Sequence, residues 1–169
     1  KMYHACAVRE KSSEEATRLK DKFLTLGAEL IEKNEWKKLL QLTELAAQEF
    51  DKATLNREMK KVGVVGEIYL KFNPFAHKHV LDWLMERGVE VVPPMLTDFF
   101  TQFFVNRKTK KNYMTDNDFI PNWIFDKIYF YLKKIVHLFD IAGSKFRYYI
   151  PFNDIFEEAE EGEKIINMN

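Results

Sequence analysis

The sequence has a single cysteine, Cys6, among its 169 residues, and it lacks any apolar run of the ~20 residues needed to cross a membrane. One thiol excludes a disulfide within the chain and is typical of proteins that work in a reducing compartment. Residues 1–15 are charged and contain no apolar segment of the kind that a signal peptide needs. We therefore predict a cytoplasmic chain that does not associate with membranes.

An excess of charge of one sign is also missing, because 26 basic residues balance 26 acidic ones. A balanced chain has no general electrostatic attraction to nucleic acid. The basic cluster at 107–111 is predicted to belong to a solvated loop over 106–117. The acidic residues at 157–163 are expected on the solvated face of a helix over about 152–162. No nucleic-acid partner is expected.

The signatures of phosphate and metal binding are absent as well. Neither GxGxxG nor GxxxxGK occurs in the sequence. His77 and His79 are two residues apart, which on a helix points them in different directions. His4 and Cys6 have no second cysteine to complete a zinc or iron–sulfur site. We predict no metal site and no catalytic residue, and we expect His137 to pack in the core.

Two amphipathic helices are predicted in a helical lead-in over residues 1–57. Ser12 followed by Glu15 has the pattern of a capping box, and apolar residues then recur at helical spacing over 13–33. The same kind of pattern predicts a second helix over 36–53. We expect an antiparallel pair whose apolar faces cover the α/β unit that follows.

A strand–helix–strand unit is predicted at 61–93. The valines between 62 and 65 are typical of a buried parallel strand, and a second valine run at 89–92 ends at two prolines. Between them a helical pattern begins near Val80 and ends before Gly88, a residue suited to a helix C-terminus. Two parallel strands need a right-handed crossover, which this helix supplies.

The rest of the sequence is dominated by a long helix predicted at 119–142, preceded by a short helix at 97–104. Aromatic residues off its main stripe widen the apolar face, so this helix is expected to be buried on more than one side or to contact a partner, such as a second copy in a homodimer. These aromatic residues are Phe125, Tyr129 and Phe130. Together the patterns predict an α/β fold whose second part is a partial open parallel sheet over 58–169.

The turn after the first predicted strand is the candidate binding site. It lies at the carboxyl end of that strand, where ligands and partners bind in open α/β sheets. Two interpretations stay open: its polar side chains contact a ligand or partner, or they cap the following helix while the tyrosine fills a gap. The candidate residues are Gly66, Glu67, Tyr69, Asn73 and Pro74.

This turn also carries a family resemblance. The strings at 66–69 (GEIY), 72–75 (FNPF), 79–80 (HV) and 88–94 (GVEVVPP) resemble the 2-hydroxyacyl-CoA dehydratase D-component family. The form they are most similar to occurs in large CoA-substrate-specific enzyme activase proteins. The matched strings lie within residues 66–94.

The resemblance implies a flavodoxin-like domain and a part in the ATP-driven reductive activation of acyl-CoA dehydration. In that family a [4Fe–4S] cluster and ATP serve the activase and dehydratase modules, but their cysteines and phosphate loops have no counterpart here. We therefore expect a catalytically silent fragment of a longer parent protein, with the remaining domains of the parent as partners and acyl-CoA as the parent's ligand. The alternative is a stand-alone α/β module that binds a small ligand or regulates another protein.

Overall fold

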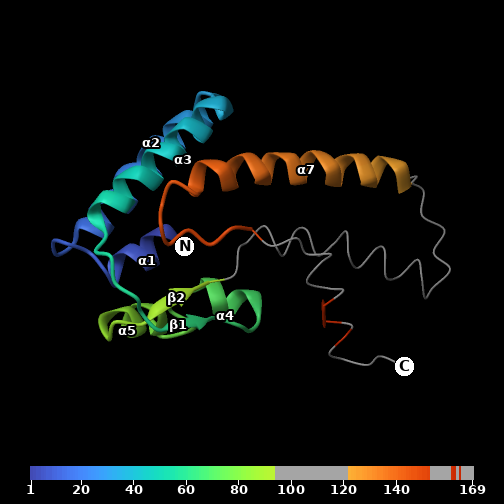
Figure 1. Cartoon of the computed structure of the whole chain (residues 1–169). Coiled ribbons are helices and arrows are strands. Elements are labelled where there is room, and N and C mark those ends of the chain that lie inside the picture. The colour runs from blue at the N-terminus through green and yellow to red at the C-terminus, as the bar shows by residue number, and fades with distance from the viewer. Residues whose placement is uncertain (94–121, 153–160, 163, 165–169) are drawn as a thin grey trace. The chain divides into compact units, whose positions relative to one another are not determined.

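The computed structural model of the chain describes residues 1–93, 122–152, 161, 162 and 164 (Figure 1). The chain divides into two compact units, of which the first comprises Lys1–Pro94 and Leu138–Pro151. The second comprises Met95–His137 and Phe152–Asn169. The boundary expected after residue 57 falls inside the first unit. The elements predicted at 97–104 and 106–117, and most of the helix predicted at 152–162, lie outside the described residues.

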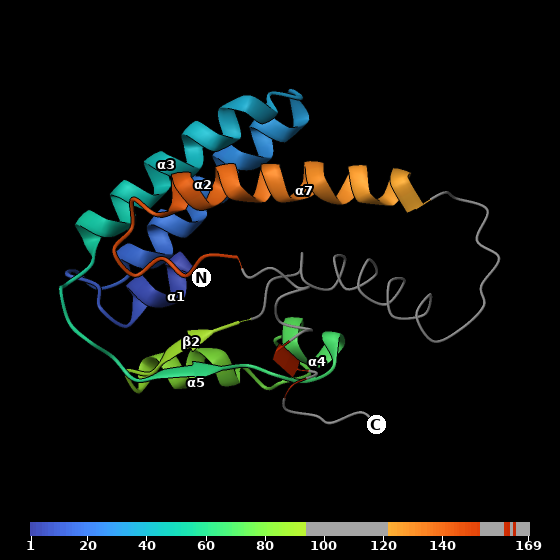
Figure 2. The ribbon, with the colours of Figure 1, turned by 45° about the vertical axis from the view of Figure 1, so that its right-hand side comes forward.

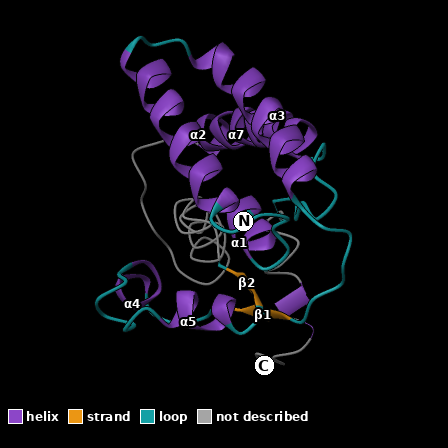
Figure 3. Cartoon of the chain, turned by 90° about the vertical axis from the view of Figure 1, so that its left-hand side faces the viewer, coloured by secondary structure: helices purple, strands orange, loops and turns teal. Residues whose placement is uncertain are grey.

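Three helices form the helical part of the first unit: α1 (Met2–Ala7), α2 (Glu15–Glu32) and α3 (Trp36–Ala53). Helices α2 and α3 lie side by side as an antiparallel pair (Figure 3), which confirms the predicted pair. Helix α1, which the sequence analysis did not predict, contacts both of them and also β2 (Glu90–Val92). Its six residues are too few to show a helical period.

The capping box predicted at the start of α2 is wrong. Glu14 is the N-cap residue, it has a left-handed backbone with φ of 64°, and it makes no side-chain cap. The amides of Glu14 and Ala16 donate instead to the carboxylate of Glu10, each at 3.0 Å. The carboxylate of Glu10, in the preceding turn, thus accepts hydrogen bonds from free amides at the helix start, which is the role that we predicted for Ser12.

The core of the first unit is formed by the three helices and the segment that follows the long C-terminal helix. The apolar faces of α2 and α3 pack within this core and not against the strands. The expectation that these two helices cover the α/β unit is therefore wrong. The buried residues of this cluster are Ala5, Cys6, Ala16, Leu19, Ala46, Ala47, Phe50, Ala53, Phe146 and Tyr148.

The predicted parallel strand pair is confirmed (Figure 2). Strand β1 (Lys61–Gly63) pairs with β2 in the register Lys61↔Glu90, Val62↔Val91 and Gly63↔Val92. The crossover contains two short helices, α4 (Ile68–Phe72) and the predicted one, α5 (Val80–Glu86). Gly88 follows α5 with φ of 72°, as expected at a helix C-terminus. The described residues thus combine helices with a small parallel sheet.

The two strands differ in burial. In β2, Glu90 and Val91 are each 1% exposed, and the strand contacts both α1 and α5. All three residues of β1 are exposed, and Val65 beyond it is 92% exposed. The prediction of a buried first strand is therefore wrong, because β1 pairs with β2 along one edge and its other surfaces face solvent.

The long helix α7 (Asn122–Gly143) confirms the described part of the helix predicted at 119–142. At its end the ring of Tyr149 lies where a Cβ of residue 143 would be, so only glycine fits there. His137 is exposed, which contradicts the core position expected for it. Among the helices in the described ranges, none is long and apolar enough to cross a membrane.

Candidate functional site

The candidate turn begins where the chain leaves β1 and forms α4. Gly66 has φ of 139°, a backbone conformation that favours glycine. Glu67 is the N-cap of α4, and its carboxylate accepts hydrogen bonds from the amides of Tyr69 at 2.8 Å and Leu70 at 3.3 Å. A carboxylate in this position also interacts favourably with the helix dipole. The main role of Glu67 in this structure is to start α4.

Asn73 makes a similar local arrangement at the other end of α4. Its side-chain oxygen accepts from the amides of Phe75 at 3.0 Å and Ala76 at 3.2 Å. Pro74, between Asn73 and Phe75, is exposed and has no amide hydrogen that needs an acceptor. The capping interpretation therefore describes both polar side chains of the turn, although Asn73 supports the turn after α4 rather than α5.

Tyr69 does not fill a gap, because 61% of it is exposed. It belongs to a segment, residues 62–83, which we call the open segment because none of its residues is buried. Phe75, at 87% exposed, is the most exposed of its aromatic residues. Exposed apolar side chains that gather in one region mark interaction sites in many proteins. The exposed apolar side chains of the open segment are Val62, Val65, Tyr69, Leu70, Phe72, Phe75, Val80 and Trp83.

The two histidines of the open segment are engaged locally. His77 accepts a hydrogen bond from the amide of Val80 through Nδ1 at 3.2 Å, and Nδ1 of His79 lies 3.2 Å from a carboxylate oxygen of Asp82. Lys78 and His79 both have left-handed backbones, with φ of 51° and 54°. Across the described ranges, no group of histidine, cysteine and acidic side chains is arranged to hold a metal ion.

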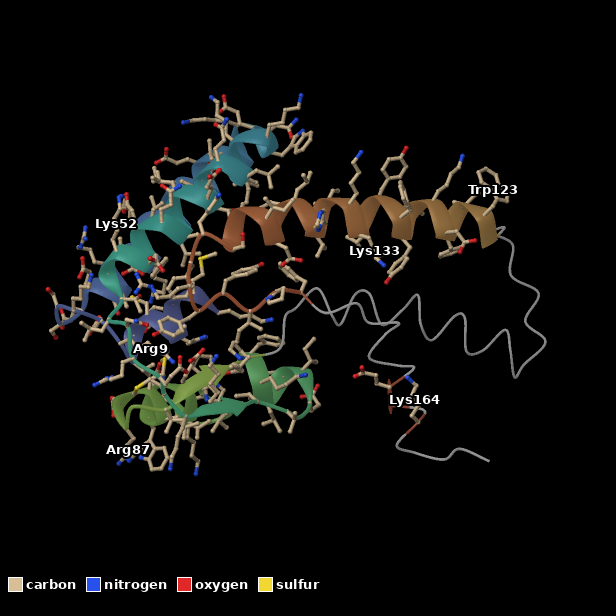
Figure 4. All side chains as sticks on the ribbon, viewed as in Figure 1. Arg9, Lys52, Arg87, Trp123, Lys133 and Lys164 are labelled. Atoms are coloured by element: carbon tan, nitrogen blue, oxygen red, sulfur yellow. The ribbon has the colours of Figure 1, made fainter. Side chains whose placement is uncertain are left out.

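A buried polar junction, which sequence reasoning missed, joins α1 to β2. Arg9 is fully buried, and its Nη2 donates to Glu90 Oε2 at 2.7 Å. Its Nε donates to the carbonyl of Arg57 at 2.6 Å and its Nη1 to that of Ala5 at 2.9 Å. The guanidinium lies 4.1 Å from the centre of the Tyr148 ring. Figure 4 labels Arg9 at this junction.

The hydroxyl of Tyr148 extends the junction to the chain that follows α3. It accepts from the amide of Arg57 at 2.8 Å, and the Arg57 guanidinium donates to the carbonyl of Val8 at 3.0 Å. All three guanidinium nitrogens of Arg9 are bonded to protein. The junction therefore fixes elements relative to one another. Arg9 and Glu90 are 81 residues apart, so no local sequence pattern indicates their pairing.

Cys6 does not fit the iron–sulfur cluster that the family resemblance implies for the parent protein. The side chain is buried in the core, and burial raises the pKa of its thiol. Cluster ligands are thiolates, and several are needed. A lone buried thiol supplies neither, so we derive no step through a cluster in this chain.

Comparison of the chain with protein-family models, with curated proteins and with solved structures finds no match.

Proposed function

We propose that this chain is a structural and interaction segment of a protein similar to the CoA-substrate-specific enzyme activases and 2-hydroxyacyl-CoA dehydratases. Such a parent takes part in the ATP-driven reductive activation of acyl-CoA dehydration in the cytoplasm. On this proposal the segment is catalytically silent and contributes part of a flavodoxin-like sheet. The [4Fe–4S] cluster, the ATP site and the contact with acyl-CoA belong to the remaining domains of the parent.

The observation that supports this proposal is the open edge of β1. The amide of Glu90 donates to the carbonyl of Lys60 at 2.8 Å. Since residues of a parallel strand alternate between facing a neighbour and facing away, the backbone groups of Lys61 and Gly63 point away from β2. Parallel sheets in proteins are covered on their faces and usually have more than two strands. An exposed edge of this kind is suited to pair with a further strand.

The side chains of the open segment support the same conclusion. Val65 and Phe75 are among its most exposed apolar residues, and the turn that bears them follows directly from β1. A strand added beside β1 would bring its own neighbouring chain toward this turn. The local capping by Glu67 and Asn73 then has a function, because it holds the apolar side chains of α4 and its flanks in a fixed conformation.

The test is whether the chain binds the rest of the protein encoded by its continuous reading frame. The two parts are expressed as separate polypeptides, and their association is measured by co-purification and by calorimetry. We expect a stoichiometric complex, together with slower hydrogen exchange at residues 61–64 in the complex than in the chain alone. A reading frame with no further domain, or two parts that do not associate, would overturn the proposal.

A pair of variants locates the contact. Changing Val65 to Lys and Phe75 to Ser should weaken association by about tenfold or more, because each places a polar group in an apolar contact. The matched control is Leu24→Lys on α2, whose side chain is 65% exposed and which should associate normally. A thermal-shift screen with acyl-CoAs, flavins and nucleotides addresses the alternative. A shift of several degrees with one ligand class would favour a stand-alone binding module.

A further inference from the structure

Most apolar residues of α7 form two parallel stripes, of which one is mainly exposed. Each stripe has alternating spacings of four and three residues, the heptad spacing of helices that pack along their length. We call the exposed stripe the α7 seam. It consists of Ile124, Ile128, Tyr131, Ile135 and Leu138. The last four of these side chains are between 40% and 63% exposed.

The second stripe of α7 is half-buried. It consists of Phe125, Tyr129, Leu132, Val136 and Phe139, each of intermediate exposure. Helix α7 is therefore covered along one stripe and open along the next. The width of the apolar face noted in the sequence follows from having both stripes on one helix, and Phe130, which lies on neither stripe and is 64% exposed, adds to it.

The spacing of the α7 seam selects a helix as its partner. A repeat of 3.5 residues keeps apolar side chains aligned with those of a second helix, whereas a strand has a repeat of two. The seam runs from Ile124 to Leu138, which at 1.5 Å per residue is about 20 Å of helix. This length matches roughly two heptads of a partner helix.

Two lysines border one side of the α7 seam. Lys127 directly precedes Ile128 and Lys134 directly precedes Ile135, so both occupy the same flanking heptad position. Both are exposed, and the Lys127 ammonium lies 5.1 Å from the centre of the Trp123 ring. In paired helices this flanking position faces the charged residues that determine partner choice.

We propose that the α7 seam binds an amphipathic helix of another protein whose apolar stripe is flanked by glutamate or aspartate. A second copy of the chain fits less well. In a parallel dimer Lys127 and Lys134 would face the apolar residues of the second stripe, and in an antiparallel dimer they would face each other. The acidic residues of α7, Asp126 and Asp140, share the heptad position opposite the seam and cannot reach these lysines across such an interface.

The test uses two synthetic 21-residue helical peptides with the same leucine and isoleucine stripe. One has glutamate at the flanking positions and the other has lysine, and each is labelled for fluorescence anisotropy against the full chain. We expect the glutamate peptide to bind about tenfold more tightly, because two ion pairs replace two repulsions. The double variant K127E/K134E should reverse this preference, whereas K37E/K38E, an equal charge change on α3, should leave it unchanged.

Three outcomes would overturn the proposal: neither peptide binds, the two bind equally, or the preference survives in K127E/K134E. A further arm addresses the second copy. Sedimentation should show a monomer at micromolar concentration, and a dimer that dissociates in I128Q/I135Q would assign the α7 seam to self-association instead. Circular dichroism of each variant verifies that the helices remain folded.

Discussion

The helical part of the first unit and its open segment lie in the same unit but differ in what covers their apolar residues. In the helical part, side chains such as Leu19 and Phe50 are almost fully buried. In the open segment, residues 62–83, no residue is buried, although aromatic and branched side chains are plentiful. The stability of the unit therefore resides in its helices, and the open segment leaves its apolar side chains exposed.

Strand β2 connects the two regions. Its outer neighbour is the exposed β1, and on its inner side Glu90 meets Arg9, which follows α1. A buried ion pair is a selective way to hold a strand, because the pair is stable in one register and a slipped strand would leave two charges unpaired. The junction thus fixes the position of β2, and through the pairing of β2 with β1 it fixes the start of the open segment.

The largest effect is expected when this junction is broken. Arg9→Ala removes the partner of Glu90 and leaves a buried carboxylate without its cation, which should lower the free energy of unfolding by about 3–5 kcal/mol. The loss of the stacking contact with Tyr148 acts in the same direction. Urea denaturation followed by circular dichroism measures the change.

Two further variants separate the charge from the packing. The double variant R9M/E90L removes both charges together, and we expect it to be more stable than Arg9→Ala. Arg87→Ala is the matched control, because that arginine is exposed and lies over Trp83 in the open segment. It should change the unfolding free energy by less than about 1 kcal/mol. If Arg9→Ala and Arg87→Ala were equally mild, β2 would not be held by this junction.

A smaller effect should appear on acidification and should come from α1. Burial is the main cause that lowers the pKa of His4, to about 4. Asp82 acts in the opposite direction, and Lys20 adds to the lowering. An unfolded histidine has a pKa near 6.5, so the unfolded chain binds the proton first as the pH falls. The contribution of His4 to the free energy of unfolding should therefore be fully present above about pH 6.5. It should decrease toward pH 4, by at most ~3 kcal/mol.

The measurement is the urea midpoint at several pH values between 7.5 and 4. The variant His4→Gln should flatten the decrease, since no group at that position then takes up a proton. The control His79→Gln changes an exposed histidine of the open segment and should leave the profile as it is. Equal effects of the two substitutions would mean that acid sensitivity is not confined to the helical part.

The sequence predicts the elements whose signal is local. Helical periodicity identifies α2 and α3, and the two valine runs with Gly88 identify the parallel pair. It does not predict α1, whose six residues carry no period, or the exposure of β1, which depends on which strands are its neighbours. Burial of Arg9 is unpredictable for a similar reason, because its partners are brought to it by distant parts of the chain.

The candidate site shows the same limit. The sequence places a polar turn at the carboxyl end of β1, and the structure contains it there. Whether Glu67 and Asn73 cap the backbone or reach a ligand depends on the conformation of a few residues, which the pattern leaves open. The exposure of Tyr69 depends on which distant parts of the chain pack near the turn, and no local pattern reports it.

The smallest effect is expected at the cap of α4. Glu67→Ala removes the acceptor of the Tyr69 and Leu70 amides, and loss of an N-cap typically lowers helix stability by about 1 kcal/mol. Because the open segment contributes no buried residue, this loss should remain local. Hydrogen exchange of the amides at 69–72 should accelerate by about fivefold, while the urea midpoint changes little.

Glu67→Asp is the control, because a shorter carboxylate still accepts hydrogen bonds at an N-cap position and should retain most of the protection. If Glu67→Ala lowered global stability as much as Arg9→Ala, the open segment would not be energetically separate from the helical part. The loss of a local cap would then unfold the helical core. A local change that also weakens binding to the rest of the proposed parent protein would instead link the fixed conformation of α4 to recognition.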